Sequence, residues 1–305
     1  MRIVSLLPAA TELCAALGAL DLVAGVTHEC DVPAAARALP RVTRSAVPEH
    51  AAPAEVDAAV RALAATGAPL FTLDEAAIAA LAPDVLLTQA LCDVCAVSEG
   101  DVRAIAAQLA AARAGVAPAV VTLGGTTLAG VLDDVRRVAD ALCRPTAGAA
   151  LVAALEARLA AVDGVLGAAQ APRPRAALVE WTAPVFLAGH WGPEMLARAG
   201  GTDVLAVAGA HSTTVDHAAL AATAPDVVIV APCGYDLARA AAEARALRDD
   251  PAWAWLAGRA VWAMDANAYV SRPGPRLVDG VEILARVLHP ARFGAPDARQ
   301  AVRIA

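Results

Sequence analysis

Cysteine and histidine residues are the parts of this sequence best suited to chemistry, because thiolate sulfur and imidazole nitrogen bind transition metals. Cys92 and Cys95 form a Cys-x-x-Cys pair directly after the apolar run 85–87, which has the length of a buried parallel strand. In open α/β sheets, ligands bind beyond the carboxyl ends of the strands, so the pair is predicted at a ligand-binding edge. Other cysteines and a histidine also follow predicted strands. The candidate metal ligands are His28, Cys30, Cys92, Cys95 and Cys233.

Three interpretations of Cys92 and Cys95 are open. The first is a zinc or iron–sulfur site, in which the pair chelates the metal together with ligands from other strand ends. The second is a thioredoxin-like dithiol, which requires its first cysteine at a helix N-terminus. The next helix is predicted to begin only at Ser98, which is too late for that role. The third is a pair of buried thiols that pack as small hydrophobic side chains.

Composition excludes several classes of protein. The chain has 305 residues, which is enough for two domains that each bury a core. Its net charge is −7 and it has no run of basic residues, so neither a nucleic acid nor an anionic membrane surface is an expected partner. The mean hydropathy is +0.55, but much of it comes from alanine. The longest uncharged stretch, 114–132, is interrupted by Pro118, Gly124 and Gly125, so no membrane insertion is predicted.

The start of the sequence lacks the pattern of a secretory signal. After Met1 and Arg2, the apolar run is short and is broken by Pro8, Glu12 and Asp21. We therefore predict a cytoplasmic location, and a periplasmic one only if the true start lies upstream. In a reducing compartment, the six cysteines are expected to be thiols or metal ligands rather than disulfides.

Strand and helix signals alternate along the chain, which predicts an α/β fold with mostly parallel sheets. Residues 33–53 contain four prolines and are predicted to be a loop. Strands are predicted at 2–7, 22–26, 70–73, 83–87, 119–123, 176–181 and 261–264. Helices are predicted at 8–18, 56–66, 75–81, 101–114, 126–142, 145–162 and 276–288.

An internal repeat indicates two lobes. Residues 78–88 and 220–230 share a helix end, an Ala-Pro-Asp turn and a buried strand. Between them, the predicted helix that begins at Pro145 is too long for a simple crossover. We therefore predict an N-terminal α/β lobe at 1–144, a connecting helix at 145–163 and a C-terminal α/β lobe at 164–305.

Aromatic residues make up only 3% of the chain, so each ring is a candidate for lining a ligand site. Most of them cluster in loops of the second lobe, beside histidines, a glutamate and an arginine that can clamp an acidic group. His190 is a candidate for contacting a cofactor face or an axial metal position. The candidate ligand-binding residues are Glu180, Trp181, His190, Trp191, His211, Tyr235, Tyr269 and Arg272.

No sequence pattern supports catalysis. The chain has no Gly-x-Ser-x-Gly elbow, no Walker loop and no Gly-x-Gly-x-x-Gly after its first strand. We therefore assign no catalytic residues and predict that the protein is not an enzyme.

Several segments resemble the helical-backbone substrate-binding proteins. They are residues 5–12, the Pro-Asp-Val strands, the segment 191–201 and the loop 272–276. More closely, and over essentially the whole chain, the sequence is similar to the branch labelled cobalamin-binding proteins or vitamin B12 ABC-transporter substrate-binding components. The resemblance implies two α/β lobes joined by one rigid helix, with the ligand held between the lobes.

The resemblance also implies a function. It suggests a non-catalytic binding protein for cobalamin, another corrinoid or a related metal-bearing small molecule, with an ABC-transporter permease as a candidate partner. Two alternative functions are open. One is a cytoplasmic metal or iron–sulfur carrier or sensor that uses the Cys-x-x-Cys site, and the other is a thiol-dependent enzyme.

Overall fold

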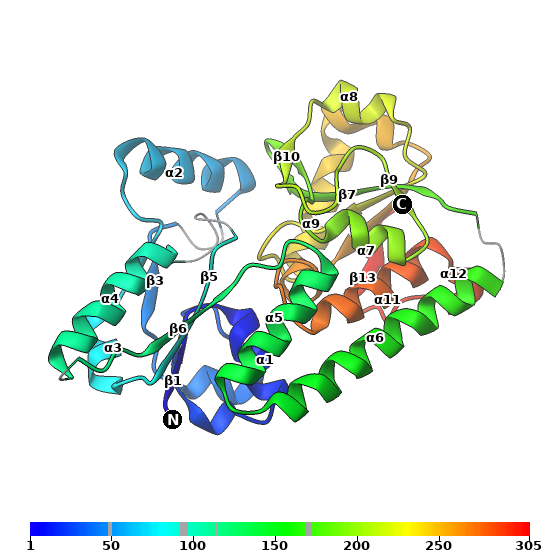
Figure 1. Cartoon of the computed structure of the whole chain (residues 1–305). Coiled ribbons are helices and arrows are strands. Elements are labelled where there is room, and N and C mark those ends of the chain that lie inside the picture. Colours follow the sequence, from blue (N-terminus) through cyan, green and yellow to red (C-terminus); the bar gives the residue numbers. More distant parts are fainter. Residues whose placement is uncertain (48–50, 92–96, 114, 169–171) are drawn as a thin grey trace. The chain divides into compact units, whose positions relative to one another are not determined.

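The computed structural model of the chain describes residues 1–47, 51–91, 97–113, 115–168 and 172–305. The chain forms two compact units, each built around its own sheet (Figure 1). The long helix α6 (Pro145–Ala168) runs from the first unit into the second. This arrangement confirms the predicted fold class of two α/β lobes joined by one helix. The first unit comprises Met1–Gly125 and Ala129–Ala153, and the second comprises Thr126–Leu128 and Ala154–Ala305.

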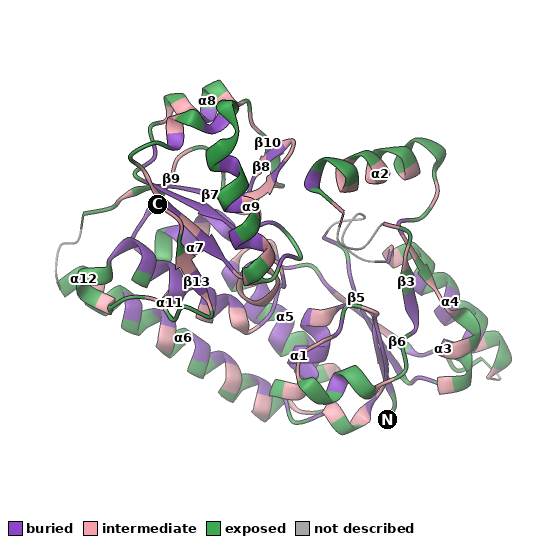
Figure 2. Ribbon diagram, turned by 180° about the vertical axis from the view of Figure 1, so that it is seen from behind, coloured by how far each residue is buried: buried purple, intermediate pink, exposed green. Residues whose placement is uncertain are grey.

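The first unit is organised around a parallel sheet with the strand order β2-β1-β5-β6. Every residue of β1 and β5 is buried, as expected for parallel strands that are covered on both faces. Figure 2 shows these strands as buried. The strands are β1 (Ile3–Ser5), β2 (Val23–Val26), β5 (Val85–Gln89) and β6 (Ala119–Leu123).

Helices cover both faces of this sheet. On one face, Val4 and Leu86 share a core with Ile78 of α3 and Ile105 of α4. Side chains alternate along a strand, so Ile3 points to the opposite face, where Figure 1 shows α1 and α5. The helices are α1 (Pro8–Ala16), α2 (Pro53–Thr66), α3 (Glu75–Leu81), α4 (Glu99–Ala112) and α5 (Leu128–Ala141), with short 3-10 helices at Leu20–Leu22 and Ala34–Ala38.

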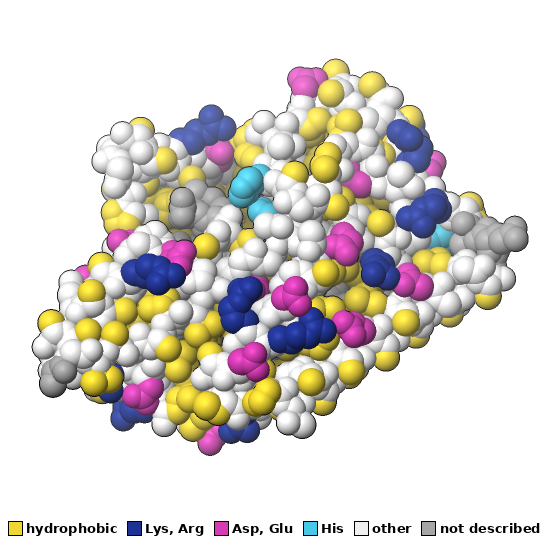
Figure 3. All heavy atoms as spheres, viewed as in Figure 1, with side chains coloured by type: hydrophobic (Ala, Val, Ile, Leu, Met, Phe, Trp, Pro, Cys, Tyr) yellow, Lys and Arg dark blue, Asp and Glu magenta, His cyan; other side chains and the backbone are white. Residues whose placement is uncertain are grey.

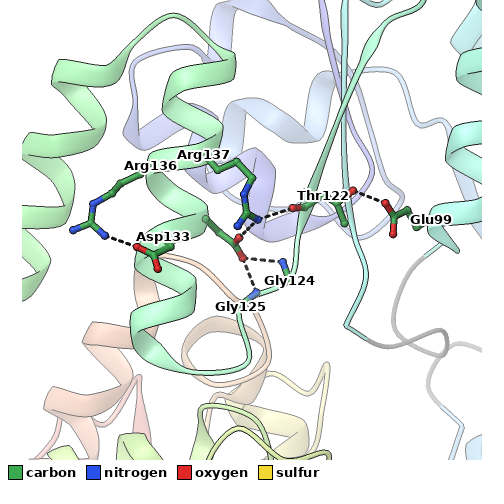
Figure 4. Close-up of polar contacts among 8 residues, drawn as sticks. Glu99, Thr122, Gly124, Gly125, Asp133, Arg136 and Arg137 are labelled. Atoms are coloured by element: carbon green, nitrogen blue, oxygen red, sulfur yellow. Dashed lines mark hydrogen bonds and ion pairs between the residues drawn. The ribbon is translucent and has the colours of Figure 1, made fainter.

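Asp134 of α5 holds the loop that follows β6 through hydrogen bonds to Gly124 and Gly125, which Figure 4 labels. Its carboxylate accepts hydrogen bonds from the backbone N–H groups of Gly124, at 3.0 Å, and Gly125, at 2.8 Å. It also pairs with Arg137, whose guanidinium donates to the carbonyl of Thr122 at 2.9 Å. Burial raises the pKa of the Asp134 carboxyl more than these partners lower it. The Asp134 carboxylate therefore caps two backbone N–H groups, and its burial costs desolvation free energy.

Removing this cap is expected to destabilise the first unit. Asp134→Ala leaves the Gly125 N–H buried without an acceptor, and we expect the free energy of unfolding to fall by about 2–4 kcal/mol. Urea denaturation followed by far-UV circular dichroism measures this change. The matched control is Asp133→Ala, because Asp133 is exposed and pairs with Arg136 on the helix surface. Its expected effect is within about 0.5 kcal/mol, and equal effects of the two variants would contradict the cap.

The predicted internal repeat is present in both units, where α3 leads into β5 and α8 (His217–Ala222) leads into β11 (Val227–Val230). In each copy, the alanine before the proline is left-handed, with φ of 45° at Ala82 and 48° at Ala224. The aspartate that follows accepts a 2.8 Å hydrogen bond from a backbone N–H beside the start of the neighbouring strand. These pairs are Asp84 with Arg2 and Asp226 with Arg175.

The second unit contains a mixed sheet with the order β10-β8-β7-β11-β12-β13, and β9 pairs with β7. Its central strands β7, β11 and β12 are parallel, whereas β8, β10 and β13 pair in the antiparallel sense. The strands not yet given are β7 (Arg175–Thr182), β8 (Val185–Leu187), β9 (Thr202–Asp203), β10 (Thr213–Thr214), β12 (Ala260–Met264) and β13 (Ala301–Arg303).

One face of this sheet packs against α8, α9 and a 3-10 helix, in a core that includes Val179, Val228 and Trp253. Elsewhere in the unit, Arg158 of α6 pairs with Asp279 and Glu282 of α11. The remaining helices are α7 (Gly192–Arg198), α9 (Leu237–Asp249), the 3-10 helix Pro251–Leu256, α10 (Ala266–Tyr269), α11 (Arg276–Leu288) and α12 (Pro290–Phe293).

The sequence misses several short strands. The predicted loop 33–53 contains β3 (Thr43–Ser45), which pairs with β4 (Phe71–Leu73) in the antiparallel sense, so that part of the prediction is wrong. Strands β8, β9, β10 and β13 were also not predicted. Each has two or three residues, which is too short to show the alternation of apolar and polar side chains that marks a strand.

Candidate ligand-binding site

The predicted ligand-binding residues all lie in the second unit, mostly near strand ends. Glu180 and Trp181 are near the end of β7, Tyr235 follows β11, and Tyr269 and Arg272 follow β12. Because β7, β11 and β12 are parallel, their carboxyl ends lie at one edge of the sheet. We call this the carboxyl edge of the second sheet.

Glu180 lies in a β-bulge, where the register between β7 and β8 shifts between Val179 and Trp181. Bulges re-aim side chains and are common beside functional sites. The carboxyl group of Glu180 is hydrogen bonded to the hydroxyl of Ser212. The oxygen of Ser212 also accepts a hydrogen bond from the backbone N–H of Gly189 at 3.0 Å. Through Ser212, Glu180 of β7 is therefore linked to the segment that contains Gly189 and His190.

His190 stands at the centre of these loops in a left-handed conformation, with φ of 49°. Its ring lies 5.1 Å from the ring of His211 and 5.6 Å from that of Trp191, measured between centroids. Its Nε2 atom is buried and has no hydrogen-bond partner within the described part of the chain. Trp191 is itself fixed, because its indole N–H donates to the carbonyl of Val270 at 2.7 Å. A buried imidazole nitrogen without a partner is a position that a bound ligand can satisfy.

A second group of side chains surrounds Tyr235. Trp181 contacts its ring edge to face, with centroids 5.6 Å apart. The guanidinium of Arg239 lies 3.7 Å above the same ring and donates to the phenol oxygen at 3.0 Å. The N–H of Asn267 donates to the Tyr235 carbonyl at 3.0 Å, and Arg272 donates to the Asn267 side chain at 2.9 Å. These contacts join the loops that follow β11 and β12.

Burial moves three ionisable groups at the carboxyl edge toward their uncharged forms. It raises the pKa of the Glu180 carboxyl to about 7, although the Ser212 hydroxyl lowers it. It lowers the pKa of His190, and the neighbouring His211 lowers it further. Burial also raises the pKa of the Tyr235 phenol, which the guanidinium of Arg239 partly offsets. All three shifts therefore favour the uncharged form of the group at neutral pH.

The raised pKa of Glu180 predicts a pH-dependent stability. From about pH 4.5 upward, the unfolded state loses this proton first, whereas the folded state keeps it until about pH 7. Stability therefore falls as pH rises through this window. Relative to Glu180→Gln, we expect the wild type to lose at most about 3 kcal/mol between pH 4 and pH 8. Urea denaturation of both proteins at each pH measures the difference, and parallel pH profiles would contradict the prediction.

The sequence prediction omitted four residues that organise the site: Gly189, Ser212, Arg239 and Asn267. Gly189 carried a signal, since it opens a Gly-His-Trp-Gly loop. A Cβ atom at this position would lie 2.4 Å from the backbone nitrogen of Ser212, so only glycine allows the two loops to approach. Ser212 lies in a loop, Arg239 in α9 and Asn267 in α10, and their sequence context gives no comparable signal.

Of the predicted metal ligands, the structure describes His28, Cys30 and Cys233. Nδ1 of His28 lies 2.7 Å from the hydroxyl of Thr43. Cys30 is buried, and its sulfur lies 3.0 Å from the hydroxyl of Thr11. Both residues belong to the first unit, whereas Cys233 is an exposed residue of the second.

Cys92 and Cys95 lie outside the described residues. Among the residues that the structure does describe, no three His, Cys, Asp or Glu side chains are grouped so that they could hold a metal ion. The Cys-x-x-Cys metal site therefore stays a prediction, and neither zinc nor an iron–sulfur cluster has support from the described residues.

The surface in view in Figure 3 intersperses arginine with acidic side chains, in keeping with the absence of a basic run in the sequence. Histidine side chains also reach this face (Figure 3). Over the described ranges, no helix combines the length and the apolar character that a bilayer crossing needs.

Two α/β units joined by one long helix define the class of substrate-binding proteins with a helical backbone. The chain belongs to the periplasmic binding protein family, whose model matches residues 3–261. This membership supports a binding rather than a catalytic protein. No curated protein matches the sequence at significant similarity.

Several solved structures share the fold. A periplasmic haem-binding protein from Pseudomonas aeruginosa is 23% identical with a TM-score of 0.71, covering 99% of this chain and 97% of its own. The haem-binding protein BhuT, solved with two haems, is 26% identical with a TM-score of 0.67, covering 95% and 98%. The vitamin B12-binding protein BtuF of Vibrio cholerae is 21% identical with a TM-score of 0.64, covering 95% and 97%.

The predicted cytoplasmic location is wrong. The family is one of periplasmic binding proteins, and the similar solved structures are described as periplasmic. The prediction relied on the first residues of the sequence, but a secretory leader is removed from the mature protein, so those residues do not report the compartment. The cysteines were expected to be reduced because the location was predicted to be cytoplasmic, so that expectation no longer has support.

Proposed function

We propose that this protein binds cobalamin or a related metal-bearing tetrapyrrole at the carboxyl edge of the second sheet and delivers it to the permease of an ABC transporter. The observation that carries the proposal is the gathering of aromatic rings at this edge. Aromatic residues form 3% of the chain, yet both of its tyrosines and two of its five tryptophans belong to the loops and strand ends described above. Flat rings are well suited to the apolar face of a macrocycle.

The comparisons support the same ligand class without distinguishing its members. Structures that share the fold are named for haem and for vitamin B12. Another, from Listeria monocytogenes, is named as an ABC-transporter substrate-binding protein and is 15% identical over 94% of this chain. At this identity, the likeness supports the fold, and the ligand has to be measured.

A direct titration tests the proposal. Hydroxocobalamin and haemin both absorb where tryptophan emits, so binding beside Trp181 or Trp191 is expected to quench fluorescence with saturation. All five tryptophans lie in the second unit, so the signal reports this unit. Free tryptophan at equal absorbance corrects for light lost to the ligand itself. Absence of saturable quenching and of any shift in ligand absorption, for both ligands up to high micromolar concentration, would refute the proposal.

A further inference from the structure

Among the residues that the structure describes, the carboxyl group of Glu180 has Ser212 as its hydrogen-bond partner and no countercharge. The Ser212 hydroxyl donates to this group when it is ionised, because a carboxylate only accepts, and the Ser212 oxygen also accepts the N–H of Gly189. Within the described ranges, no arginine or histidine forms an ion pair with Glu180. The residue is partly buried rather than sealed, so a ligand can reach it. A carboxyl group in this setting can act both as a donor, when protonated, and as an acceptor.

The surrounding polar groups point to an uncharged ligand surface. The buried Nε2 of His190 belongs to an imidazole that burial and His211 keep neutral. Arg239 stacks on Tyr235 and bonds its phenol oxygen, and Arg272 bonds the side chain of Asn267. The guanidinium groups of Arg239 and Arg272 thus contact protein groups at this edge. Whenever Glu180 is ionised, a ligand carboxylate placed beside it would meet a like charge, with no cation among the described residues to offset it.

We infer that Glu180 recognises a primary carboxamide on the rim of the ligand, so that the site selects an amide-bearing corrinoid over a porphyrin that carries carboxylates. A primary carboxamide offers an N–H donor beside a carbonyl acceptor, and a protonated carboxyl offers an O–H donor beside a carbonyl acceptor. The two groups can therefore form a pair of hydrogen bonds side by side. This inference rests on the proposed function, because it assigns the ligand class of the same site.

The first test compares ligands that differ at the rim. We expect hydroxocobalamin, whose rim carries primary amides, to bind at least tenfold more tightly than haemin, whose rim carries two carboxylates. Tryptophan quenching and isothermal titration calorimetry at pH 7 give both dissociation constants. If haemin binds as tightly as hydroxocobalamin or more tightly, the inference is overturned while the proposed function stands. If neither ligand binds, the proposed function itself fails.

The second test changes Glu180. We expect Glu180→Ala to weaken hydroxocobalamin binding about tenfold, because both hydrogen bonds are lost. Glu180→Gln keeps a donor and an acceptor in nearly the same shape, so it is expected to restore most of that loss. The matched control is Glu156→Gln, since Glu156 is an exposed residue of α6 outside the site. Wild-type affinity in Glu180→Ala would overturn the inference, and denaturation curves of each variant confirm that it is folded.

The third test measures how ionisation of Glu180 changes the affinity for a ligand that carries a carboxylate. In monocarboxylic acid derivatives of cobalamin, one rim amide is replaced by a carboxylate. For the derivative altered at the contacting amide, we expect wild-type affinity to fall about tenfold from pH 6 to pH 8, as Glu180 ionises and repels it. Glu180→Gln is expected to remove this pH dependence. A merely structural role for Glu180 predicts no such ligand-specific difference, and equal pH profiles in the two proteins for every isomer would overturn the inference.

Discussion

Replacement of Gly280 by alanine is expected to lower the free energy of unfolding of the second unit by about 2–4 kcal/mol. Gly280 is a buried residue of α11, and a Cβ atom there would lie 2.2 Å from the carbonyl oxygen of Tyr269 and 2.5 Å from the terminal methyl of Met195. The methionine end can move, but the backbone oxygen can move only with the short helix α10, which ends at Tyr269. The substitution should therefore both destabilise the unit and displace a candidate ligand-binding residue.

Tryptophan fluorescence in urea measures this effect, because every tryptophan lies in the second unit. The matched control is Gly164→Ala, in the part of α6 that belongs to the same unit. A Cβ atom at Gly164 would meet no heavy atom within 4 Å. Alanine also favours helix over glycine, so the control is expected to stabilise the protein by about 0.5–1 kcal/mol. Destabilisation by both substitutions, or by neither, would contradict the close approach at Gly280.

Loss of the aromatic pair Trp181 and Tyr235 is expected to have the largest effect on ligand binding. If the two rings contact the macrocycle, Trp181→Ala should weaken binding about 30-fold, which is about 2 kcal/mol. The rings lie edge to face, so Tyr235→Ala also removes support from Trp181. We therefore expect the double variant to lose less than the sum of the two single losses, by about 0.5–1.5 kcal/mol. Calorimetric titration with hydroxocobalamin or haemin, whichever binds the wild type, gives these values.

A tryptophan elsewhere in the unit provides the control. Trp255 stacks on Trp253, with ring centroids 5.7 Å apart, in the 3-10 helix Pro251–Leu256. Its indole nitrogen is buried and has no partner within the described residues, so Trp255→Phe removes no hydrogen bond seen in the structure. Affinity should stay within about twofold of wild type. A loss as large as that of Trp181→Ala would show that the binding surface lies elsewhere or that the unit responds globally.

The sequence was sufficient wherever the signal is local. Asp74 directly precedes the helix predicted at 75–81, and Ser98 is the residue at which a helix was predicted to begin; each side chain accepts a hydrogen bond from the first turn, at 2.9 Å and 3.1 Å. The helices 75–81 and 276–288 and the strand 119–123 have the predicted bounds. The repeated Ala-Pro-Asp turn forms the same hydrogen bond in both units. Capping, periodicity and proline act over a few residues, so they can be read from the chain itself.

The candidate site could be predicted from the sequence only in part. Its aromatic residues and Glu180 were identifiable by type, because rings are rare in this chain and follow predicted strands. Their partners were not, since Ser212 reaches Glu180 only through the bulge in β7 and the close approach of Gly189. The raised pKa of Glu180 likewise comes from burial, which depends on residues that are distant in sequence.

By itself, the sequence determined the α/β class, the two-lobed organisation and the position of most long elements, because alternation, helical spacing and turn residues are properties of neighbours along the chain. The tertiary structure alone decided which side chains meet. It set Cys30 against Thr11 in the first unit, and it joined Glu180, Ser212 and His190 through loops in the second. Strand order, register and close backbone approach decide such meetings, and these arise only when segments far apart in the sequence pack together.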